Sequence, residues 1–575
     1  MKIKIKVIAL MIVLMCALSS FTSCKKGNNT DGKDGETYSV VIYKGRATGK
    51  SEGSDDQAVT DALEEKFYQD RGIKIDLQIK IYNGDDLTQK INTALGNKRV
   101  AMDVFGNTVS GNAGSSLVYD YGKDVNGSTK KVGSLLEKYG QHILAAIREN
   151  DPEHIVERTG YISIKGDFQL KLIPTVYHGK SYGLMVRKDY WKRAFEAGKT
   201  SLNPENYDIS NNDYENLTID EFESVMRAIK ETVDAVSTPI TGFAWDLERT
   251  IGASLGEGYL NMYKDSDGDL FPKDLSEGYA KLLDYLYSWS KEGLWEKDSL
   301  QQTDDDRLGN FLVGKNAAYI VYPDVENLIT VARRLSTVDS DSKCMLVAPF
   351  KVNDGNGNYS VRGFYEQNPC FQGLALPYDG NNSEVFIQFL DWMYENPDNY
   401  EMAKYGIKGK HWIDGPDYTW TINEKTYTYK TWQYPAAKMA EYSKKAPYSG
   451  IWEEVLRNVN ISDRLNNAWT PVEKNWYIYA TNVCEGYSEK EMYGYLLPEL
   501  PRTIDKNAYS EQIMYATYTR DNAFAGRLYN GITPSGNIET YRKAIKSGSR
   551  EYLDWYKQQY KAYSDFYAEK FGSSK

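Results

Sequence analysis

The sequence predicts an α/β protein built as two lobes around parallel sheets. The chain has 575 residues, more than one compact domain usually holds, and its 41% hydrophobic and 26% charged residues are ordinary globular usage. Residues 38–105 alternate between strand-like and helix-like patterns, which is the order of a parallel sheet layered with helices. No Pro- or Ser-rich linker divides the body, so we expect two interleaved lobes.

The alternation is clearest in the first elements. Residues 38–43 (YSVVIY) are a short apolar run typical of a buried strand, and residues 73–82 (IKIDLQIKIY) alternate strictly, as a strand with two different faces does. Apolar residues spaced by four predict the intervening helices. The expected order is strand 38–43, helix 55–69, strand 73–82, helix 86–95 and strand 101–105.

The same patterns continue along the chain. Thr218 followed by Glu221 is a capping box, which marks a helix start. Cys344 and Cys370 bracket a Gly/Asn-rich turn of an expected hairpin and are close enough in sequence to pair. Further strands are predicted at 181–186, 239–245, 316–322, 346–350 and 371–376, and helices at 189–197, 219–236, 277–290, 385–394 and 538–571.

The N-terminus indicates export and lipidation. Met1–Lys6 is cationic, and the twelve apolar residues Val7–Leu18 suit a signal peptide and are too short to span a membrane. Phe21-Thr22-Ser23-Cys24 resembles a bacterial lipobox, which predicts a signal peptide over 1–23 and a lipid on Cys24. Residues 24–36 then form a polar tether.

Charge and aromatic composition narrow the ligand class. The net charge is −11, and removing a leader with three lysines and no acid leaves −14, which disfavours nucleic acid as a partner. The chain has 47 Tyr and 12 Trp against 17 Phe. Tyr and Trp combine an apolar face with a polar tip, which suits the C–H faces and hydroxyls of sugars.

Several segments resemble a known family, the family 1 extracellular solute-binding lipoproteins of ABC sugar importers, which are related to the maltose-binding protein. They occur in the family's order over roughly residues 38 to 560. The matching stretches are Gly179–Gly183 with Arg187–Trp191, Leu217–Phe222, Trp289–Leu294, Gly314–Ala318, Asp391–Tyr394 with Tyr405–His411, and Gly548–Tyr560. Lys408 stands where the family usually has Glu.

The resemblance implies a periplasmic-binding-protein-like clamp with a hinge of crossing strands and an extra C-terminal helical segment. The first lobe is expected to comprise residues 37–170 and 345–415, and the second 171–344 and 416–575. A carbohydrate would bind between the lobes, and the closed form would be recognised by an ABC permease. The implied protein is a monomer anchored at the cell surface or in the periplasm.

Candidate ligand contacts are aromatic and polar residues just beyond predicted strands, where α/β sheets bind ligands. Trp offers a stacking face, and Asp accepts from two adjacent hydroxyls. Tyr322 falls where the maltose-binding relatives place an aromatic platform. The candidates are Trp245, Asp246, Tyr322, Asp324, Asn107, Lys44, Arg46, Trp412 and Trp432.

Motifs for catalysis, cofactors and metals fail their tests. Asp265–Asp269 opens like an EF-hand, but Leu270 and Ser276 stand where the loop needs Gly and Glu. Gly179-Lys180-Ser181 lacks the first glycine of a P-loop, and the four histidines have no ligand spacing. We therefore expect no cofactor, metal or catalytic residue.

Three alternatives stay open from the sequence. A secreted glycoside hydrolase would need two facing carboxylates, which 80 acidic residues do not exclude. A glycan-capture lipoprotein of the outer membrane would be mostly helical. The same clamp could also bind a peptide or another small solute, because fold does not fix the ligand.

Overall fold

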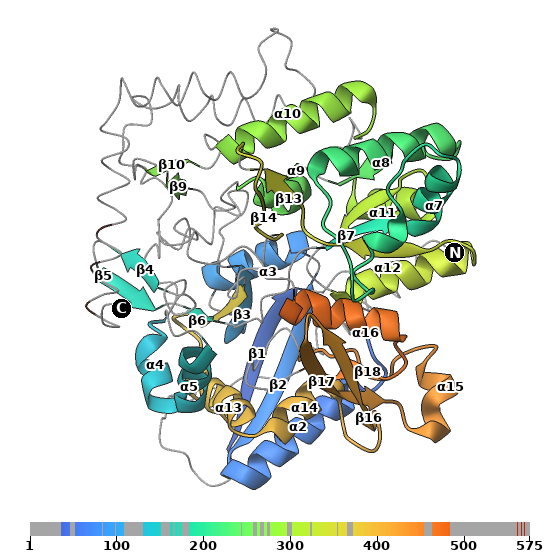
Figure 1. Cartoon of the computed structure of the whole chain (residues 1–575). Coiled ribbons are helices and arrows are strands. Elements are labelled where there is room, and N and C mark those ends of the chain that lie inside the picture. The colour runs from blue at the N-terminus through green and yellow to red at the C-terminus, as the bar shows by residue number, and fades with distance from the viewer. Residues whose placement is uncertain are drawn as a thin grey trace, which may run out of the picture.

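Figure 1 shows the chain as a computed structural model. The structure describes residues 36–45, 52–82, 84–97, 99–108, 130–150, 161–164, 167–170, 172–174, 183–242, 244–256, 262–264, 270–272, 277–295, 302–321, 325–353, 355–364, 372–452 and 463–483, together with Lys561, Asp565 and Glu569. Within these ranges it is a two-lobed α/β protein, as the sequence predicts.

The first lobe is organised by a five-stranded sheet. Its strand order is β2-β1-β3-β15-β6. β1 is parallel to β2 and β3, whereas β15 is antiparallel to both β3 and β6. The strands are β1 (Thr37–Gly45), β2 (Lys74–Tyr82), β3 (Val104–Thr108), β6 (Leu172–Pro174) and β15 (Gln372–Ala375).

Helices cover both faces of this sheet, because alternate residues of β1 are apolar in both directions. Val40 and Ile42 pack with Leu63 of α2, whereas Val41 and Tyr43 pack with Ile91 of α3. The predicted spacing of α2 is confirmed, and the helix ends at Gly72, which adopts φ 70°. The helices are α2 (Asp56–Arg71), α3 (Gly84–Gly96), α4 (Gly133–Tyr139), α5 (Gln141–Asn150), α13 (Ser383–Glu395) and α14 (Pro397–Tyr405).

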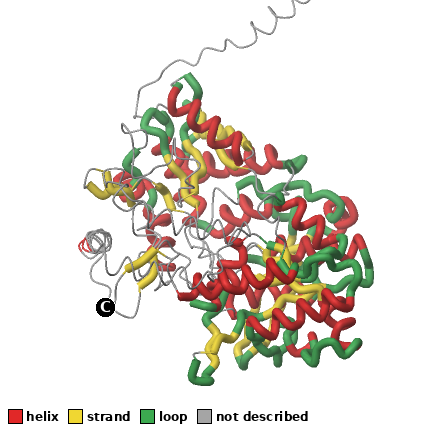
Figure 2. The backbone as a smooth tube through the Cα atoms, turned by 90° about the horizontal axis from the view of Figure 1, so that it is seen from above, coloured by secondary structure: helices red, strands yellow, loops and turns green. Residues whose placement is uncertain are grey.

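The second lobe is organised by a four-stranded sheet of order β12-β7-β11-β8. β7 is antiparallel to β11 and β12, and β11 is parallel to β8. Figure 2 shows strands enclosed between helices. The elements are β7 (Gly183–Arg187), β8 (Ile240–Thr241), β11 (Ala318–Val321), β12 (Cys344–Val347), α7 (Lys188–Glu196), α8 (Ile219–Thr232), α10 (Glu277–Glu292), α11 (Asp304–Leu312) and α12 (Val325–Val338).

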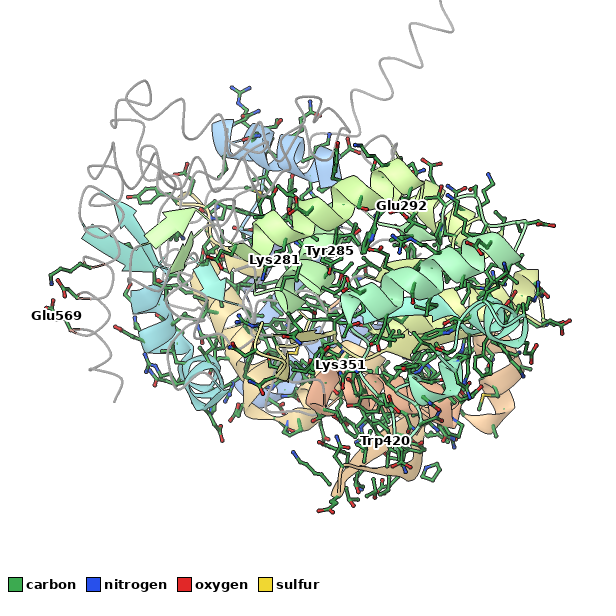
Figure 3. All side chains as sticks on the ribbon, turned by 45° about the horizontal axis from the view of Figure 1, so that its top comes forward. Lys281, Tyr285, Glu292, Lys351, Trp420 and Glu569 are labelled. Carbon is green, nitrogen blue, oxygen red and sulfur yellow. The ribbon has the colours of Figure 1, made fainter. Side chains whose placement is uncertain are left out.

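Helices α8 and α10 lie on one face of the second sheet. The predicted capping box of Thr218 and Glu221 starts α8. Polar contacts then join the two helices outside their apolar seam: the Tyr285 hydroxyl donates to Asp220 at 2.7 Å, and the Trp289 indole donates to Glu223 at 2.7 Å. Figure 3 shows Tyr285 on α10, between the labelled Lys281 and Glu292.

A C-terminal unit packs on the other face of the second sheet. Its hairpin turns at Asn423 and Glu424, which have positive φ values as a two-residue turn requires. Trp420 and Ile422 enter the core beneath α12 together with Trp476. The unit comprises β16 (Ile413–Ile422), β17 (Lys425–Gln433), η6 (Ala436–Lys438), α15 (Met439–Tyr442), β18 (Leu465–Asn466), α16 (Pro471–Ile478) and η7 (Tyr479–Val483). The helix predicted at 538–571 lies almost entirely outside the described residues.

Two predictions about the middle of the chain are wrong. The strand expected at 239–245 is limited to β8, and a helical turn follows it. The strands expected at 346–350 and 371–376 do not pair with each other, because β12 belongs to the second sheet and β15 to the first. The Gly/Asn-rich turn instead closes its own small hairpin of β13 (Lys351–Asn353) and β14 (Tyr359–Val361).

The remaining elements are short. Cys344 carries a free thiol, and Cys370, considered as its partner, lies outside the described residues. The short elements are β4 (Tyr161–Ile164), β5 (Asp167–Leu170), η3 (Pro204–Asn206), α9 (Ala244–Leu247), η4 (Glu248–Gly252), β9 (Met262–Lys264) and β10 (Leu270–Pro272).

A carboxyl group beneath the first sheet gives a pH test of this packing. Glu64 accepts the backbone N–H of Leu77 at 2.7 Å, and burial raises its pKa from 4.5 to about 7, with Asp76 and Asp61 adding repulsion. Because the folded-state pKa is raised, its stabilising contribution is present below the unfolded pKa and is lost as pH rises through 7. We predict that Glu64→Gln weakens the fall in melting temperature between pH 5 and about pH 8.

Glu65→Gln is the matched control, because Glu65 is exposed on the same helix and bonds to Gln69. Its pH profile should follow the unmodified protein. Equal pH profiles for the two variants would mean that the pKa of Glu64 is not raised by its partly buried position.

Candidate functional site

The strand directions place the ends of several strands at one edge of each sheet. In the first sheet, the carboxyl ends of β1, β3 and β6 lie beside the amino end of β15. In the second sheet, the carboxyl ends of β8, β11 and β12 lie beside the amino end of β7. Each sheet therefore has one edge at which loops after its strands gather, which is where α/β proteins bind ligands.

The chain crosses between these two edges twice. It leaves the first sheet at Pro174 and enters the second at Gly183, then leaves the second at Val347 and returns at Gln372. Nine peptide units separate Pro174 from Gly183, so their Cα atoms lie at most about 30 Å apart. The ligand edges of the two sheets are thus joined by connections that start and end on them.

In the second lobe, the chain turns after β8, which ends at Thr241, and a helical segment begins at Ala244. Gly242 allows this turn: it adopts φ 155°, and its carbonyl accepts the indole N–H of Trp295 at 3.0 Å. α9 and then the π-helical turn η4 follow without a break. π-Helical turns inside helices are frequent at functional sites. The hydroxyls of Thr250 and Ser254 are buried and bond back to carbonyls four residues earlier.

A buried ion pair supports this segment from inside. Arg307 of α11 donates through Nη1 to Oδ2 of Asp246 at 2.6 Å, and each residue is only 3% exposed. Two charges so deeply buried depend on each other, because removing one takes away the attraction that offsets the desolvation of the other. Asp246, predicted as a ligand contact, therefore carries a structural interaction that fixes α9 at the end of β8.

The other second-lobe candidates come after strands that end at this same edge of the sheet. Trp245 is part of α9, so it follows a strand as predicted, on a helical turn. β11 ends at Val321 and is parallel to β8, with Tyr319 opposite Thr241. Tyr322 and Asp324 come next in the chain and lie outside the described residues.

Two first-lobe candidates, Lys44 and Asn107, lie inside strands, whereas the sequence predicts that they follow those strands. Lys44 is inside β1 and buried, and its ammonium donates to the carbonyl of Ile451. Asn107 is inside β3, opposite Gly373 of β15, at the shared edge of the sheet. Arg46 follows β1 and lies outside the described residues. The prediction that Lys44 follows the strand is wrong, because β1 extends through Gly45.

Trp412 and Trp432 belong to a different part of the molecule. Trp412 is buried, and its indole donates to the carbonyl of Gly406 at 2.8 Å. Its ring lies 5.5 Å from Tyr405, which in turn lies 5.9 Å from Trp432. The two tryptophans thus form an aromatic row with Tyr405 between α14 and β17.

Sequence patterns miss the most informative contact of this site. Arg307 follows three aspartates, an arrangement that reads as a solvated helix start, and Thr303 with Asp306 does cap α11. Only the tertiary fold shows that Arg307 turns inward to Asp246. No group of three or more metal-ligating side chains gathers anywhere in the described ranges. No helix in those ranges combines the length and apolar character needed to cross a membrane.

Comparison with known proteins gives one sequence relative. No protein-family model matches the chain. The polygalacturonan/rhamnogalacturonan-binding protein YtcQ of Bacillus subtilis is 24% identical over 316 residues. The matched stretch is 54% of this chain and 56% of that protein, so it spans just over half the length of the relative.

Solved structures show the fold over nearly the full length. The alginate-binding protein AlgQ2 is similar at TM-score 0.55 and 15% identity, over 91% of this chain and 98% of its own. The Streptococcus pneumoniae ABC-transporter substrate-binding protein FusA, in complex with kestose, gives 0.55 and 13%, over 92% and 100%. An extracellular solute-binding protein of Bifidobacterium longum subsp. infantis gives 0.57 and 13%, over 92% and 98%. The chain has the fold of these solute-binding proteins.

The buried ion pair generates a stability prediction. We predict that Asp246→Ala lowers the free energy of unfolding by about 3–5 kcal/mol, because it leaves the Arg307 guanidinium buried without its carboxylate. Urea denaturation measures this loss.

The control is Asp417→Ala, which removes the acid of an exposed pair with Lys430 at 3.0 Å. That pair should be worth less than about 1 kcal/mol. Equal losses from the two substitutions would contradict the structural role of Asp246.

Proposed function

We propose that this chain, which has the fold of solute-binding proteins, is the lipid-anchored, extracytoplasmic substrate-binding subunit of an ABC importer that captures an oligosaccharide. The observation that carries the proposal is the full-length likeness to sugar-binding proteins: over 90% of this chain superposes on 98% or more of the alginate-binding and kestose-bound structures. Because this likeness extends over both lobes, it supports a function that uses the whole fold.

The geometry suits capture by closure. The two sheet edges belong to different lobes, so a ligand held between them would contact both only when the lobes approach. Such a ligand favours the closed state by the free energy of the contacts that closure adds. In this proposal Trp245 supplies a stacking face from the second lobe, and the end of β3 around Asn107 supplies polar groups from the first. The closed form is what the permease recognises.

Carbohydrate is the ligand class that the observations favour. The sequence relative is described as binding polygalacturonan and rhamnogalacturonan, and the structural relatives as binding alginate or kestose. The excess of Tyr and Trp over Phe in this chain fits stacking on sugar rings. A peptide on the same fold lacks any comparable support.

Capture without chemistry distinguishes this proposal from a glycoside hydrolase. Hydrolysis requires two carboxyl groups on either side of a glycosidic bond. Asp246, the acid described at the second-lobe edge, is buried against Arg307 and unsuited to that task. The ligand is therefore expected to leave the protein unchanged.

The anchor is tested separately from the ligand. We predict that Cys24→Ser abolishes incorporation of labelled palmitate and releases the protein into the soluble fraction of cells. Cys16→Ser, a control within the leader, should leave both unchanged. Continued lipidation of the Cys24 variant would contradict the predicted anchor.

The ligand prediction uses thermal shift of the body from Lys25 onward. An oligosaccharide at 100 times its Kd should add about 2.7 kcal/mol to stability and raise the melting temperature. Trp245→Ala should raise the Kd of that sugar about tenfold, ~1.4 kcal/mol. Tyr378→Ala, which alters a side chain that is 66% exposed, should leave the Kd unchanged.

Chromatography of the sugar after incubation completes the test. Recovery of the intact sugar supports capture, whereas released reducing ends would make the protein an enzyme. A response to peptides with silence across sugars would contradict the carbohydrate assignment.

A further inference from the structure

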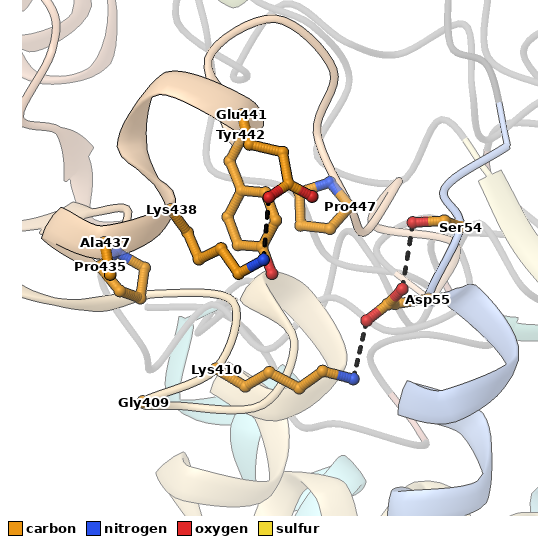
Figure 4. Close-up of a pocket in the computed structure, with 10 residues that line it drawn as sticks. All are labelled: Ser54, Asp55, Gly409, Lys410, Pro435, Ala437, Lys438, Glu441, Tyr442 and Pro447. Carbon is orange, nitrogen blue, oxygen red and sulfur yellow. Dashed lines mark hydrogen bonds and ion pairs between the residues drawn. The ribbon is translucent and has the colours of Figure 1, made fainter.

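A pocket of about 480 Å³ opens in the part of the molecule that also holds the aromatic row (Figure 4). It lies between the start of α2, the turn at Gly409 and Lys410, and the segment of η6 and α15. This volume is within the range of small-ligand sites. None of the residues predicted to bind at the sheet edges lines it.

Two ion pairs stand on different walls of this pocket. Lys410 lies 2.7 Å from Oδ2 of Asp55 on one wall, and Lys438 donates to Oε2 of Glu441 at 2.8 Å on the other. The close-up shows the first pair beside α2 and the second on the α15 segment. Each pair therefore offers a donor beside an acceptor, and together the four charges balance.

The first wall is held in place from behind. His411 is 1% exposed, and its Nδ1 accepts the backbone N–H of Ile407 at 2.9 Å. Its Nε2 therefore carries the proton and donates to Asp55 at 3.1 Å. Hydrogen bonds from Lys410 and His411 lower the pKa of Asp55 to about 2, and burial lowers the pKa of His411. At neutral pH Asp55 is an ionised acceptor in a fixed position.

Apart from Ser54, whose hydroxyl donates to Asp55 at 3.0 Å, the rest of the lining is apolar. Pro435 and Pro447 present aliphatic rings, and Tyr442 presents a ring that is 8% exposed. The Tyr442 ring contacts Tyr434 at 5.5 Å, and Tyr434 contacts Trp432 at 5.3 Å. Trp432, predicted from the sequence as a carbohydrate contact, is thus linked to this pocket through Tyr434 and Tyr442.

We propose that this pocket is a second saccharide site that takes a neutral pyranose, alone or as one unit of a chain. Adjacent hydroxyls of a pyranose can each donate and accept. One hydroxyl can donate to the carboxylate of an ion pair while the adjacent hydroxyl accepts from the ammonium. Two ion pairs can therefore bind two diols of one ring. The proline and tyrosine rings meet the C–H face of the sugar.

The charge balance selects against ionic ligands. A uronate would bring a negative charge to two lysines whose charges are already matched by Asp55 and Glu441. It would also approach those carboxylates, which repel it. The pocket therefore favours neutral sugars over their uronic acids, whatever the ligand between the lobes is.

The test is ligand-observed saturation-transfer NMR with methyl galactoside and methyl glucoside as neutral probes and galacturonate as the acidic probe. The double variant Lys438→Ala/Glu441→Ala removes one pair without changing net charge. We expect it to weaken the neutral-sugar signal at least fivefold at equal concentration. Both side chains are largely exposed, so the fold should persist.

The matched control is Lys430→Ala/Asp417→Ala, which removes an exposed pair on the neighbouring hairpin. Its signal should equal that of the unmodified protein. Equal signals from all three proteins, or a stronger response to galacturonate than to the neutral probes, overturns the second site.

The thermal-shift response to the oligosaccharide captured between the lobes should be the same in all three proteins. That readout separates the two proposals, because loss of the NMR effect leaves capture between the lobes intact. Conversely, a protein that shows no thermal shift with any sugar can still give the variant-dependent NMR signal.

Discussion

The two crossings between sheets are the constraint on which the arrangement depends. Each begins at the ligand edge of one sheet and ends at the ligand edge of the other, from Pro174 to Gly183 and from Val347 to Gln372. Because the first crossing spans so few residues, the sheets cannot turn these edges far apart. Loops that follow strands of two separate lobes are thereby kept near one another. In the proposed function, closure would need only rotation about the crossings, with each lobe keeping its own core.

A third connection runs through the C-terminal unit. Arg464 donates to Glu401 of α14 in the first lobe, and Lys404 forms an ion pair with Asp463. The next residue, Leu465, is fully buried in the core beneath α12 of the second lobe. A segment held at one end by ion pairs with the first lobe and at the other by apolar packing with the second will respond to any relative movement of the lobes.

The sequence predicts a helix or strand well where local signals, such as the spacing of apolar residues on one buried face, specify it. The four-residue spacing of Val59, Leu63 and Phe67 specifies α2, and the capping box at Thr218 specifies α8. Prediction from sequence fails where contacts with distant parts of the chain decide the structure. A short apolar run at 239–245 fits a strand or a buried helical turn equally well, and only the fold converts its end into α9. Likewise, local pattern cannot assign β12 and β15 to different sheets.

The site is harder to predict than the fold for the same reason. Strand ends could be located approximately from sequence, so Trp245 falls just after β8 and Asn107 within the last residues of β3. The partner of a charged side chain could not be located from sequence. Asp246 forms an ion pair with Arg307, which is sixty-one residues away in the sequence. Trp412 and Trp432 have the right chemistry for sugars, yet tertiary packing puts them in an aromatic row with Tyr405, which local pattern does not reveal.

Closure of the two lobes on a sugar is the central claim, and an interlobe distance tests it most directly. Spin labels at Glu137→Cys on α4 and Lys192→Cys on α7, both exposed positions in different lobes, would report that distance by pulsed electron paramagnetic resonance. We predict that adding the oligosaccharide makes the mean interlobe distance shorter and its distribution narrower. An unchanged distribution at saturating sugar would contradict it.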